Sequence, residues 1–188
     1  MEKTKRTIIV VDMQNDFIDG NLGSEDTKAI VEDVANLLKE AKENGDNIIF
    51  TQDTHPPMTE EGLTLEAQHF PTHCVKDTHG WHIIDELKEF EDDAKKEFPS
   101  AVVSKSAFSV PDWRSTRLIG EDDEIVVIGV CTDICVISNA LSLRSEYPDN
   151  PIKIYENCTA GTSVELKEAA LKIAKANLID IDWYEPSN

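Results

Sequence analysis

Short apolar strand segments alternate along this chain with segments of helical periodicity, and this alternation constrains the fold more than any other feature. The strand segments are rich in Ile and Val, and the segments between them carry apolar residues at helical spacing. Strands that alternate with helices form βαβ units, in which helices cover both faces of a parallel sheet. The sequence therefore predicts a three-layer α/β fold with a mostly parallel, Rossmann-like central sheet.

The boundaries of these segments follow from apolar periodicity and from capping residues. We expect strands at residues 7–11, 47–51, 101–104, 124–129, 152–155 and 178–181. Helices are expected from a cap at Ser24 or Asp26 to Gly45, and at residues 83–90, 113–118 and 134–143. Thr162 and Glu165 match a capping box. They precede an amphipathic helix with apolar positions at Leu166, Ala169, Ala170 and Ile173.

Length and charge limit the domain count and the classes of partner. A chain of 188 residues suits one core of ordinary size, so we expect residues 1–188 to form a single domain. The formal net charge of −19 argues against nucleic acids and membranes as partners, because both are bound by basic patches. No apolar run approaches the ~20 residues of a membrane span. Four cysteines without a secretory signal predict reduced thiols and a cytoplasmic protein.

The segment at residues 124–136 places a cysteine where a buried strand gives way to a helix. A tight turn follows the strand, and Cys135 lies near the start of the helical stretch. The helix dipole and free backbone N–H groups favour a thiolate at such a position. Open α/β sheets also bind ligands at the carboxyl ends of their strands. Cys135 is therefore a candidate nucleophile, and a small buried core cysteine is the alternative interpretation.

All five histidines lie in or just after the long irregular segment at residues 52–81. Asp53 and His55 directly follow the second strand, where residues two positions apart point the same way. His73 can return to the same point across the loop. Two imidazoles and one or two carboxylates suit zinc, iron or manganese. The segment therefore predicts a site for one divalent transition metal, with solvated loop histidines as the alternative.

Two further side chains follow strand segments and could serve the same site. Asp12 ends the first strand, which the sheet topology places close to the Cys135 turn, so its carboxylate could take the thiol proton. Lys105 follows the strand at residues 101–104 and offers a cation that would hold a thiolate. Taken alone, Asp12 could simply cap a turn and Lys105 could be a surface residue. Together with Cys135 they form a candidate catalytic group.

These motifs together resemble the isochorismatase-like cysteine hydrolases, and within them the nicotinamidase and pyrazinamidase branch. The resemblance spans residues 7–181 and is carried by five segments. The segments are VDMQNDF (11–17), DTH (53–55), FPTHC (70–74), the stretch at Lys105 and GVCTDICV (129–136). The resemblance implies the isochorismatase-like hydrolase fold, an Asp12–Lys105–Cys135 triad and an oxyanion hole formed by the backbone N–H groups of Cys131 and Cys135.

The resemblance also implies a ligand set and a substrate. The family's metal ligands fall on Asp53, His55 and His73, with Glu66 at the spacing of a fourth ligand and Glu61 as a less favoured substitute. Zinc is expected first, with iron and manganese as alternatives. The implied reaction is hydrolysis of nicotinamide to nicotinate and ammonia, in pyridine nucleotide salvage. Three aromatic side chains are candidates to pack the substrate ring: Phe17, Phe70 and Phe108.

Two departures from the family pattern bear on the substrate. The run from Lys105 to Phe108 is shorter than the aromatic-containing run common in nicotinamidases, so the pocket wall can differ. Cys131 stands where many nicotinamidases have alanine, and its thiol permits oxidation or pairing. A related hydrolase of another small amide, or of a carbamoyl or ureido compound, is the first alternative, and a homo-oligomer is possible. A non-catalytic metal-binding or redox protein is the second alternative, although it leaves Asp12 and Lys105 unexplained.

Overall fold

A computed structural model describes residues 5–57 and 65–186, and within them six strands form one sheet in the order β3-β2-β1-β4-β5-β6. Each pairing between neighbouring strands is parallel. The strands are β1 (Arg6–Val11), β2 (Asn47–Asp53), β3 (Val102–Lys105), β4 (Glu124–Val130), β5 (Ile152–Ala160) and β6 (Asp180–Asp182). The expectation of a mostly parallel sheet is confirmed.

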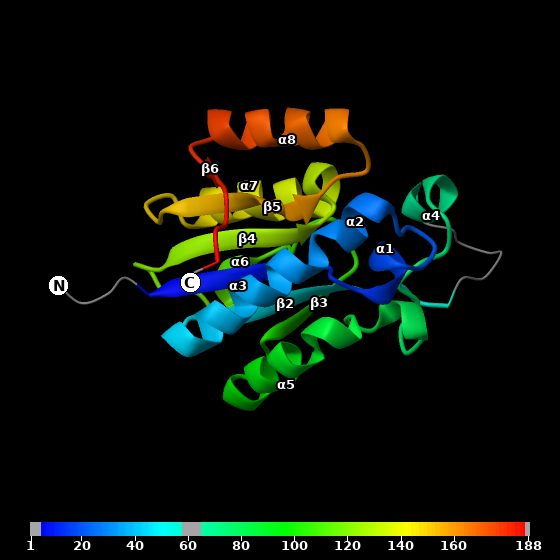
Figure 1. Ribbon diagram of the computed structural model, residues 1–188, viewed down its shortest axis with the longest axis horizontal. Coiled ribbons are helices and arrows are strands. Elements are labelled where there is room, and N and C mark those ends of the chain that lie inside the picture. The colour runs from blue at the N-terminus through cyan, green and yellow to red at the C-terminus, as the bar shows by residue number, and fades with distance from the viewer. Residues whose placement is uncertain (1–4, 58–64, 187–188) are drawn as a thin grey trace.

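Helices cover both faces of this sheet and make the fold three-layered (Figure 1). One face carries α1 (Asn15–Ile18), α2 (Glu25–Ala29), α3 (Val31–Asn44) and α5 (Lys88–Glu97). The other carries α6 (Trp113–Thr116), α7 (Ile137–Glu146) and α8 (Val164–Ala176). The remaining turns are α4 (Leu65–His69), η1 (His79–Trp81), η2 (Asp85–Leu87) and the π-helical turn η3 (Thr132–Val136). The predicted fold class is thereby confirmed.

The alternation of side chains along the central strands divides the interior into two cores. In β1, Ile8 and Val10 pack on the side of α3, whereas Ile9 and Val11 pack on the side of α7. Successive residues of a strand point to opposite faces, so a strand covered on both sides must be apolar at every position. This requirement explains the uninterrupted Ile and Val runs of β1 and β4.

The order of the strands determines where a ligand site is expected. The chain leaves β1 toward β2 on one side and later returns to β4 on the other side of β1. The carboxyl ends of β1 and β4 therefore flank a point where the topology reverses direction, which is where open α/β sheets bind ligands. Figure 1 shows both strands running toward the side of the molecule where α1, α2 and α4 lie.

Several helix boundaries differ from the sequence expectation. The helix expected at residues 83–90 is the short turn η2 followed by α5, which extends to Glu97. The expected capping box of Thr162 and Glu165 is wrong, because Ser163 caps α8 by accepting a hydrogen bond from the N–H of Leu166. Thr162 instead binds Asp133 through both its N–H and its hydroxyl. Ser24 does form a capping box, with Thr27.

Helix α8 also orients its apolar residues differently from the simple amphipathic expectation. The helix buries Ala170, Leu171 and Ala174. Leu166 and Ile173, which share the expected apolar stripe, are each 51% exposed. Of the expected stripe, only Ala170 is buried, and the larger residues face outward.

No helix in residues 5–57 and 65–186 combines the length and the apolar character that a bilayer crossing requires. The central sheet draws strands from both ends of the described chain, from Arg6 to Asp182. The single-domain organisation of residues 1–188 and the cytoplasmic location remain predictions.

Candidate active site

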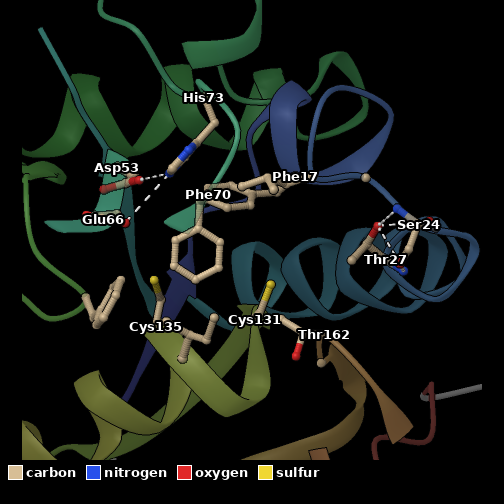
Figure 2. A pocket seen from close by; sticks show the side chains of 15 residues that line it. Phe17, Ser24, Thr27, Asp53, Glu66, Phe70, His73, Cys131, Cys135 and Thr162 are labelled. Carbon is tan, nitrogen blue, oxygen red and sulfur yellow. Dashed lines mark hydrogen bonds and ion pairs between the residues drawn. The ribbon is translucent and has the colours of Figure 1, made fainter. Parts of the chain in front are cut away.

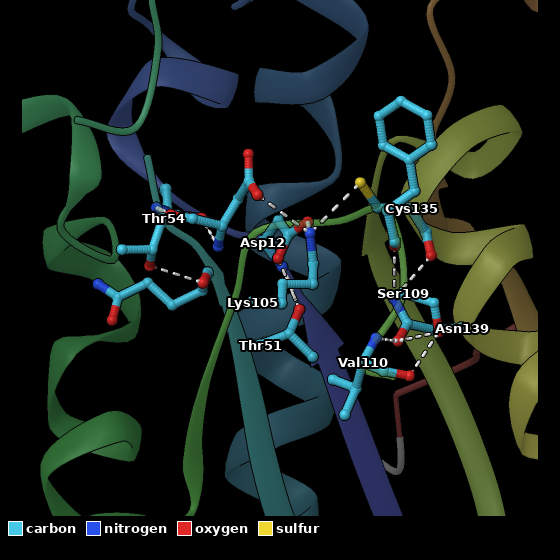
Figure 3. Close-up of polar contacts among 12 residues, drawn as sticks. Asp12, Thr51, Thr54, Lys105, Ser109, Val110, Cys135 and Asn139 are labelled. Carbon is cyan, nitrogen blue, oxygen red and sulfur yellow. Dashed lines mark hydrogen bonds and ion pairs between the residues drawn. The ribbon is translucent and has the colours of Figure 1, made fainter. Parts of the chain in front are cut away.

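Four neighbouring strands deliver polar side chains to the same edge of the sheet. Asp12 follows β1, Asp53 ends β2, Lys105 ends β3 and the Cys135 turn follows β4. Asp53 and Lys105 are register partners across β2 and β3. Because parallel strands end at a common edge, these groups converge although up to 123 positions separate them in the sequence. Figure 3 shows Asp12, Lys105 and Cys135 brought together in this way.

Lys105 lies at the centre of the cluster that it forms with Asp12, Asp53 and Cys135, and its side chain is fully buried. Its Nζ lies 2.7 Å from Asp12 Oδ2, 3.4 Å from Asp53 Oδ1 and 3.6 Å from Cys135 Sγ. The second oxygen of Asp12, Oδ1, accepts a hydrogen bond from the Thr51 hydroxyl at 2.6 Å. A buried cation with no partner would be very costly, so the carboxylates and the thiol define the position of the ammonium group.

Burial and mutual charge set the protonation states in this cluster. Burial alone would lower the pKa of Lys105, but Asp12, Cys135 and Asp53 raise it above its ordinary value. Burial raises the pKa of Asp12, and Lys105 opposes this shift. Asp12 is therefore suited to accept a proton near neutral pH, while Lys105 stays charged.

The Cys135 thiol differs from the sequence expectation of a favoured thiolate. Burial, followed by the Asp12 carboxylate, raises the pKa of Cys135 well above its ordinary value, although Lys105 acts in the opposite direction. The expectation was wrong because it took account of the helix N-terminus and not of the loss of water around the sulfur. The thiol of the free protein therefore needs a base to remove its proton, and Asp12 is the adjacent carboxylate.

The turn that carries Cys135 is fixed by a buried asparagine of α7. Asn139 donates hydrogen bonds to the carbonyls of Cys135 at 2.8 Å and Phe108 at 3.1 Å. Its own oxygen accepts the N–H of Val110 at 3.0 Å. Asn139 thus ties the Cys135 turn to the segment after Lys105 (Figure 3).

A second cluster, of four metal-ligating donors, lies beside the first. Asp53, His55, Glu66 and His73 each offer one ligand atom, and these atoms lie within 4.8 Å of one another. His55 Nε2 is 2.9 Å from Asp53 Oδ2, and His73 Nε2 is 3.4 Å from the same oxygen. Glu66 Oε1 lies 4.0 Å from His55 Nε2 and 3.7 Å from His73 Nε2. Glu61, the substitute ligand considered from the sequence, lies outside the described residues.

These separations fit a single metal ion. Zinc bonds of about 2.0–2.1 Å in a tetrahedron place neighbouring donors roughly 3.3 Å apart. Two imidazole nitrogens and two carboxylate oxygens are also a donor set that suits a borderline divalent cation. The cluster is therefore a candidate metal site.

Neighbouring groups hold the donors in orientation. His73 Nδ1 lies 2.7 Å from the carbonyl of Pro71, which directs Nε2 toward Asp53 and Glu66. Burial would raise the pKa of Asp53, but hydrogen bonds from His55 and His73 together with Lys105 hold it well below its ordinary range. Asp53 is thus a permanent anion that faces the metal donors with Oδ2 and Lys105 with Oδ1.

A cavity of about 290 Å³ joins the two clusters. Figure 2 shows Asp53, Glu66 and His73 on one wall, the sulfurs of Cys131 and Cys135 on the opposite wall, and Phe70 between them. The three aromatic residues expected to pack a ring, Phe17, Phe70 and Phe108, all line this cavity. A wider cavity of about 680 Å³ shares Phe70 and Phe108 with it, so the site adjoins a larger hollow on the side of α4.

Three groups of site residues were not identified from the sequence. Thr51 and Asn139 position Asp12 and Cys135, and Gln14 exchanges hydrogen bonds with the backbone of Asp53. Ser24, Thr27 and Thr162 form a polar end of the cavity away from the metal donors. Gln14 lies inside the VDMQNDF motif, and a buried glutamine after an apolar strand was the available signal. The others depend on contacts between distant segments.

The four cysteines are free and buried, but only two of them line the cavity. Burial raises the pKa of Cys131 and of Cys158 to about 12. Cys74 is fully buried beside Asp53 and Asp16, and its pKa is raised as well. Among the cysteines, only Cys135 lies within 3.6 Å of the Lys105 ammonium in a hydrogen-bonding geometry.

The fold and the two clusters together define the class: a three-layer α/β protein with a buried cysteine, lysine and aspartate beside a candidate metal-ligating set. The sequence matches the isochorismatase domain family over residues 6–182. The chain belongs to the isochorismatase family of hydrolases, as the sequence resemblance predicts.

Several similar proteins are named nicotinamidases or pyrazinamidases. The nicotinamidase of Escherichia coli (strain K12) is 30% identical over 96% of this chain and 97% of that protein. The crystal structure of nicotinamidase/pyrazinamidase from Bacillus subtilis is 26% identical and superposes with a TM-score of 0.78, covering 95% of this chain and 99% of that one. The pyrazinamidase of Pyrococcus horikoshii in complex with zinc is 25% identical with a TM-score of 0.74, covering 96% and 99%.

Proposed function

We propose that this protein is a metal-dependent cysteine amidohydrolase, and that nicotinamide is its leading substrate. One observation carries the proposal: a cavity of ring-binding size has the Cys135 sulfur on one wall and a four-donor metal site on the other. A planar amide held between them would present its carbonyl carbon to the thiol. The similarity to nicotinamidases supports the choice of substrate.

The candidate metal site would hold one divalent transition ion through Asp53, His55, Glu66 and His73. The mixed nitrogen and oxygen donors favour zinc, with iron and manganese as alternatives. When bound, the ion would offer a Lewis-acidic position for the pyridine nitrogen and so orient the ring. Phe17, Phe70 and Phe108 would pack against the ring faces and edge.

The protein's own groups would carry out the hydrolysis. Asp12 takes the proton of Cys135, and the thiolate attacks the amide carbon. The backbone N–H groups of Cys131 and Cys135 stabilise the oxyanion. Asp12 then gives its proton to the departing nitrogen, which leaves as ammonia and yields a thioester. Asp12 next takes a proton from water, whose oxygen attacks the thioester, and it returns that proton to the Cys135 sulfur.

Lys105 would hold both partners in place throughout this cycle. Its ammonium lies close to the Asp12 carboxylate and to the Cys135 sulfur, so it balances whichever of the two is anionic. The negative charge passes from Asp12 to the Cys135 sulfur and then to the substrate oxygen in the tetrahedral intermediate. The Asp53 carboxylate stays anionic 3.4 Å from the ammonium, so the buried cation keeps an anionic partner at each stage.

Cysteine replacement tests the nucleophile. Cys135→Ala should lower kcat for ammonia release from nicotinamide by at least ~10³-fold, because the residues of a catalytic unit act together. Cys158→Ala is the matched control, since that cysteine lies outside the cavity, and it should keep its activity. Wild-type rates in Cys135→Ala would refute the proposed nucleophile.

Histidine replacement tests the metal site. His55→Ala and His73→Ala should each remove the bound ion in elemental analysis while the far-UV circular dichroism stays native. His79→Ala is the control, because His79 is exposed and is not part of the donor set. Glu66→Ala tests the fourth ligand separately. Full metal occupancy in both His55→Ala and His73→Ala would place the ion elsewhere.

An amide panel tests the substrate. Nicotinamide and pyrazinamide carry a ring nitrogen meta to the carboxamide, whereas benzamide has none. Loss of that contact should cost on the order of 10²-fold or more in kcat/KM, and metal removal should abolish the difference. Equal rates for all three amides would contradict orientation through the ring nitrogen.

The wider neighbouring cavity favours one alternative, a related hydrolase that acts on another small amide or on a carbamoyl or ureido compound. Phe108, at the end of the short run after Lys105, is 40% exposed and lines both cavities. Hydrolysis of such compounds without hydrolysis of nicotinamide would select this alternative. Metal-loaded protein that releases ammonia from no amide would point to a non-catalytic or redox role.

A further inference from the structure

The outer face of α8 carries an apolar stripe that no other described element covers. Leu166, Ala169, Ile173 and Ala176 follow one another at spacings of three, four and three residues, so they lie on one side of the helix. All four are exposed, and Leu166 and Ile173 are each 51% exposed. Figure 1 shows α8 at the margin of the molecule, with its inner side toward α7 and β6. The stripe is thus a helix face without a partner in the described chain.

Charges along one edge of this stripe are arranged by sign. Glu165 and Glu168 lie in the amino-terminal half of the helix, and Lys172 and Lys175 lie in the carboxyl-terminal half. Glu165 and Lys172 stand seven residues apart, as do Leu166 and Ile173, so each pair spans two helical turns. Lys167 is not part of this edge, because its Nζ donates to the carbonyls of Glu156 and Thr159 beneath the helix.

A second copy of α8 that runs in the opposite direction places its lysines opposite the glutamates of the first copy. In a two-fold pair of antiparallel α8 helices, Leu166 of one copy faces Ile173 of the other. The same axis brings Glu165 of one copy opposite Lys172 of the other, and symmetry repeats this contact. Within a single chain Lys172 has only a loose, exposed pairing with Glu168 at 3.8 Å, so its charge remains available.

The charge of the rest of the molecule also favours this face for self-association. Two chains of formal net charge −19 repel one another, and contact through an acidic surface would add to that repulsion. The exposed charges along the stripe balance as two glutamates and two lysines. Contact through α8 therefore brings two copies together along a stretch whose own charges cancel.

We propose that α8 is the interface of a homodimer, in which the Leu166–Ile173 stripes of two copies pack antiparallel with Glu165 opposite Lys172 of the second copy. The occupant of the uncovered face is thus a second copy of this chain. Charge placement sets the relative direction of the helices, and the apolar stripe provides the buried area.

Sedimentation velocity on the full chain tests the interface. Over roughly 1–200 µM protein at 0.15 M salt, a range that brackets the dissociation constants of small interfaces, the mass should shift from monomer to dimer. Ile173→Glu should hold the protein monomeric over the same range. Leu166→Glu provides a second variant at an equally exposed position, and circular dichroism confirms folding of both.

Charge reversal tests the antiparallel geometry. Lys172→Glu should weaken dimerisation by ~10-fold or more, because it places Glu165 opposite a second glutamate. The double variant Glu165→Lys/Lys172→Glu should restore it, since the charges again alternate across the axis. Lys39→Glu, which makes the same change of net charge on the exposed side of α3, should leave dimerisation nearly unchanged.

Three outcomes would overturn the proposal. Wild-type protein that stays monomeric to the top of the range has no such interface. A dimer that survives Ile173→Glu and Lys172→Glu uses another surface. A dimer weakened by Lys172→Glu and not restored by the double variant does not pair its helices in the antiparallel register.

Discussion

At the scale of single residues, Asp12 shows how the fold holds a buried carboxylate in a fixed position. Its backbone has φ +50°, a region that side-chain-bearing residues rarely adopt, and its side chain is fully buried. Thr51 and Lys105 hold its two oxygens. Backbone strain of this kind persists where the surrounding structure enforces it, and it is common at functional sites.

Asp12→Asn should separate thiol reactivity from catalysis. Hydrolysis should fall by about 10²–10⁴-fold, because the amide cannot act as the base. Alkylation of Cys135 by iodoacetamide near neutral pH should become faster, since the Asp12 carboxylate raises the pKa of that thiol and Lys105 would remain beside it. Peptide mapping after brief labelling measures the second effect.

Cys158 gives an internal reference in the same digest, because Asp12 does not contribute to the raised pKa of its thiol. Its labelling should be equally slow in wild type and variant. Slower or unchanged labelling of Cys135 in Asp12→Asn would show that the carboxylate does not suppress the thiolate.

At the scale of secondary structure elements, the carboxyl end of β4 is tightly packed against its neighbour β1. Gly129 has φ +108°, and a Cβ atom placed there would lie 2.1 Å from the carbonyl oxygen of Val11 in β1. The register between β4 and β5 shifts between Val127 and Gly129. On the other side of β4 the register with β1 is continuous up to Val11 and Gly129, so the strand end before the Cys135 turn lies directly against β1.

Gly129→Ala should destabilise the protein by more than ~3 kcal/mol in urea unfolding, because a strained backbone and a clash with a buried strand add together. Gly45→Ala is the matched control, since Gly45 also has positive φ but has nothing within 4 Å of the added Cβ. Its cost should be about 1 kcal/mol, from the left-handed conformation alone. Equal losses in the two variants would show that β1 can move away.

At the scale of the whole molecule, the net charge of −19 is the dominant electrostatic feature. The ion pairs on exposed helix surfaces, such as Lys88 with Asp92 and Lys172 with Glu168, contribute little to stability. Self-repulsion among the excess carboxylates opposes the compact state, and this effect acts over the Debye length.

Sodium chloride should therefore raise the melting temperature at low ionic strength. Between ~10 mM and ~200 mM salt the Debye length falls from about 30 Å to under 10 Å, which screens the repulsion. Differential scanning fluorimetry with chloride, rather than the surface-excluded sulfate ion, isolates the screening effect. A melting temperature that falls over this range would mean that attractive pairs outweigh the net repulsion.

The sequence by itself determined the three-layer class, the alternation of strands and helices, and the convergence of Asp12, Asp53, Lys105 and the Cys135 turn. These inferences depend on local information: apolar periodicity sets the elements, and polar residues at strand ends must gather at one edge of a parallel sheet. The motif resemblance also placed Glu66 beside His55 and His73, and the structure brings their donor atoms together.

Only the tertiary structure decided the raised pKa of Cys135, the supporting roles of Thr51 and Asn139, and the outward stripe of α8. Each of these depends on which segments pack together and on how much water they exclude. Periodicity shows that a helix has an apolar side, but the face it buries depends on the shape of the layer beneath it. Likewise, a thiol's position at a helix start is visible in the sequence, whereas the desolvation that raises its pKa exists only in the folded protein.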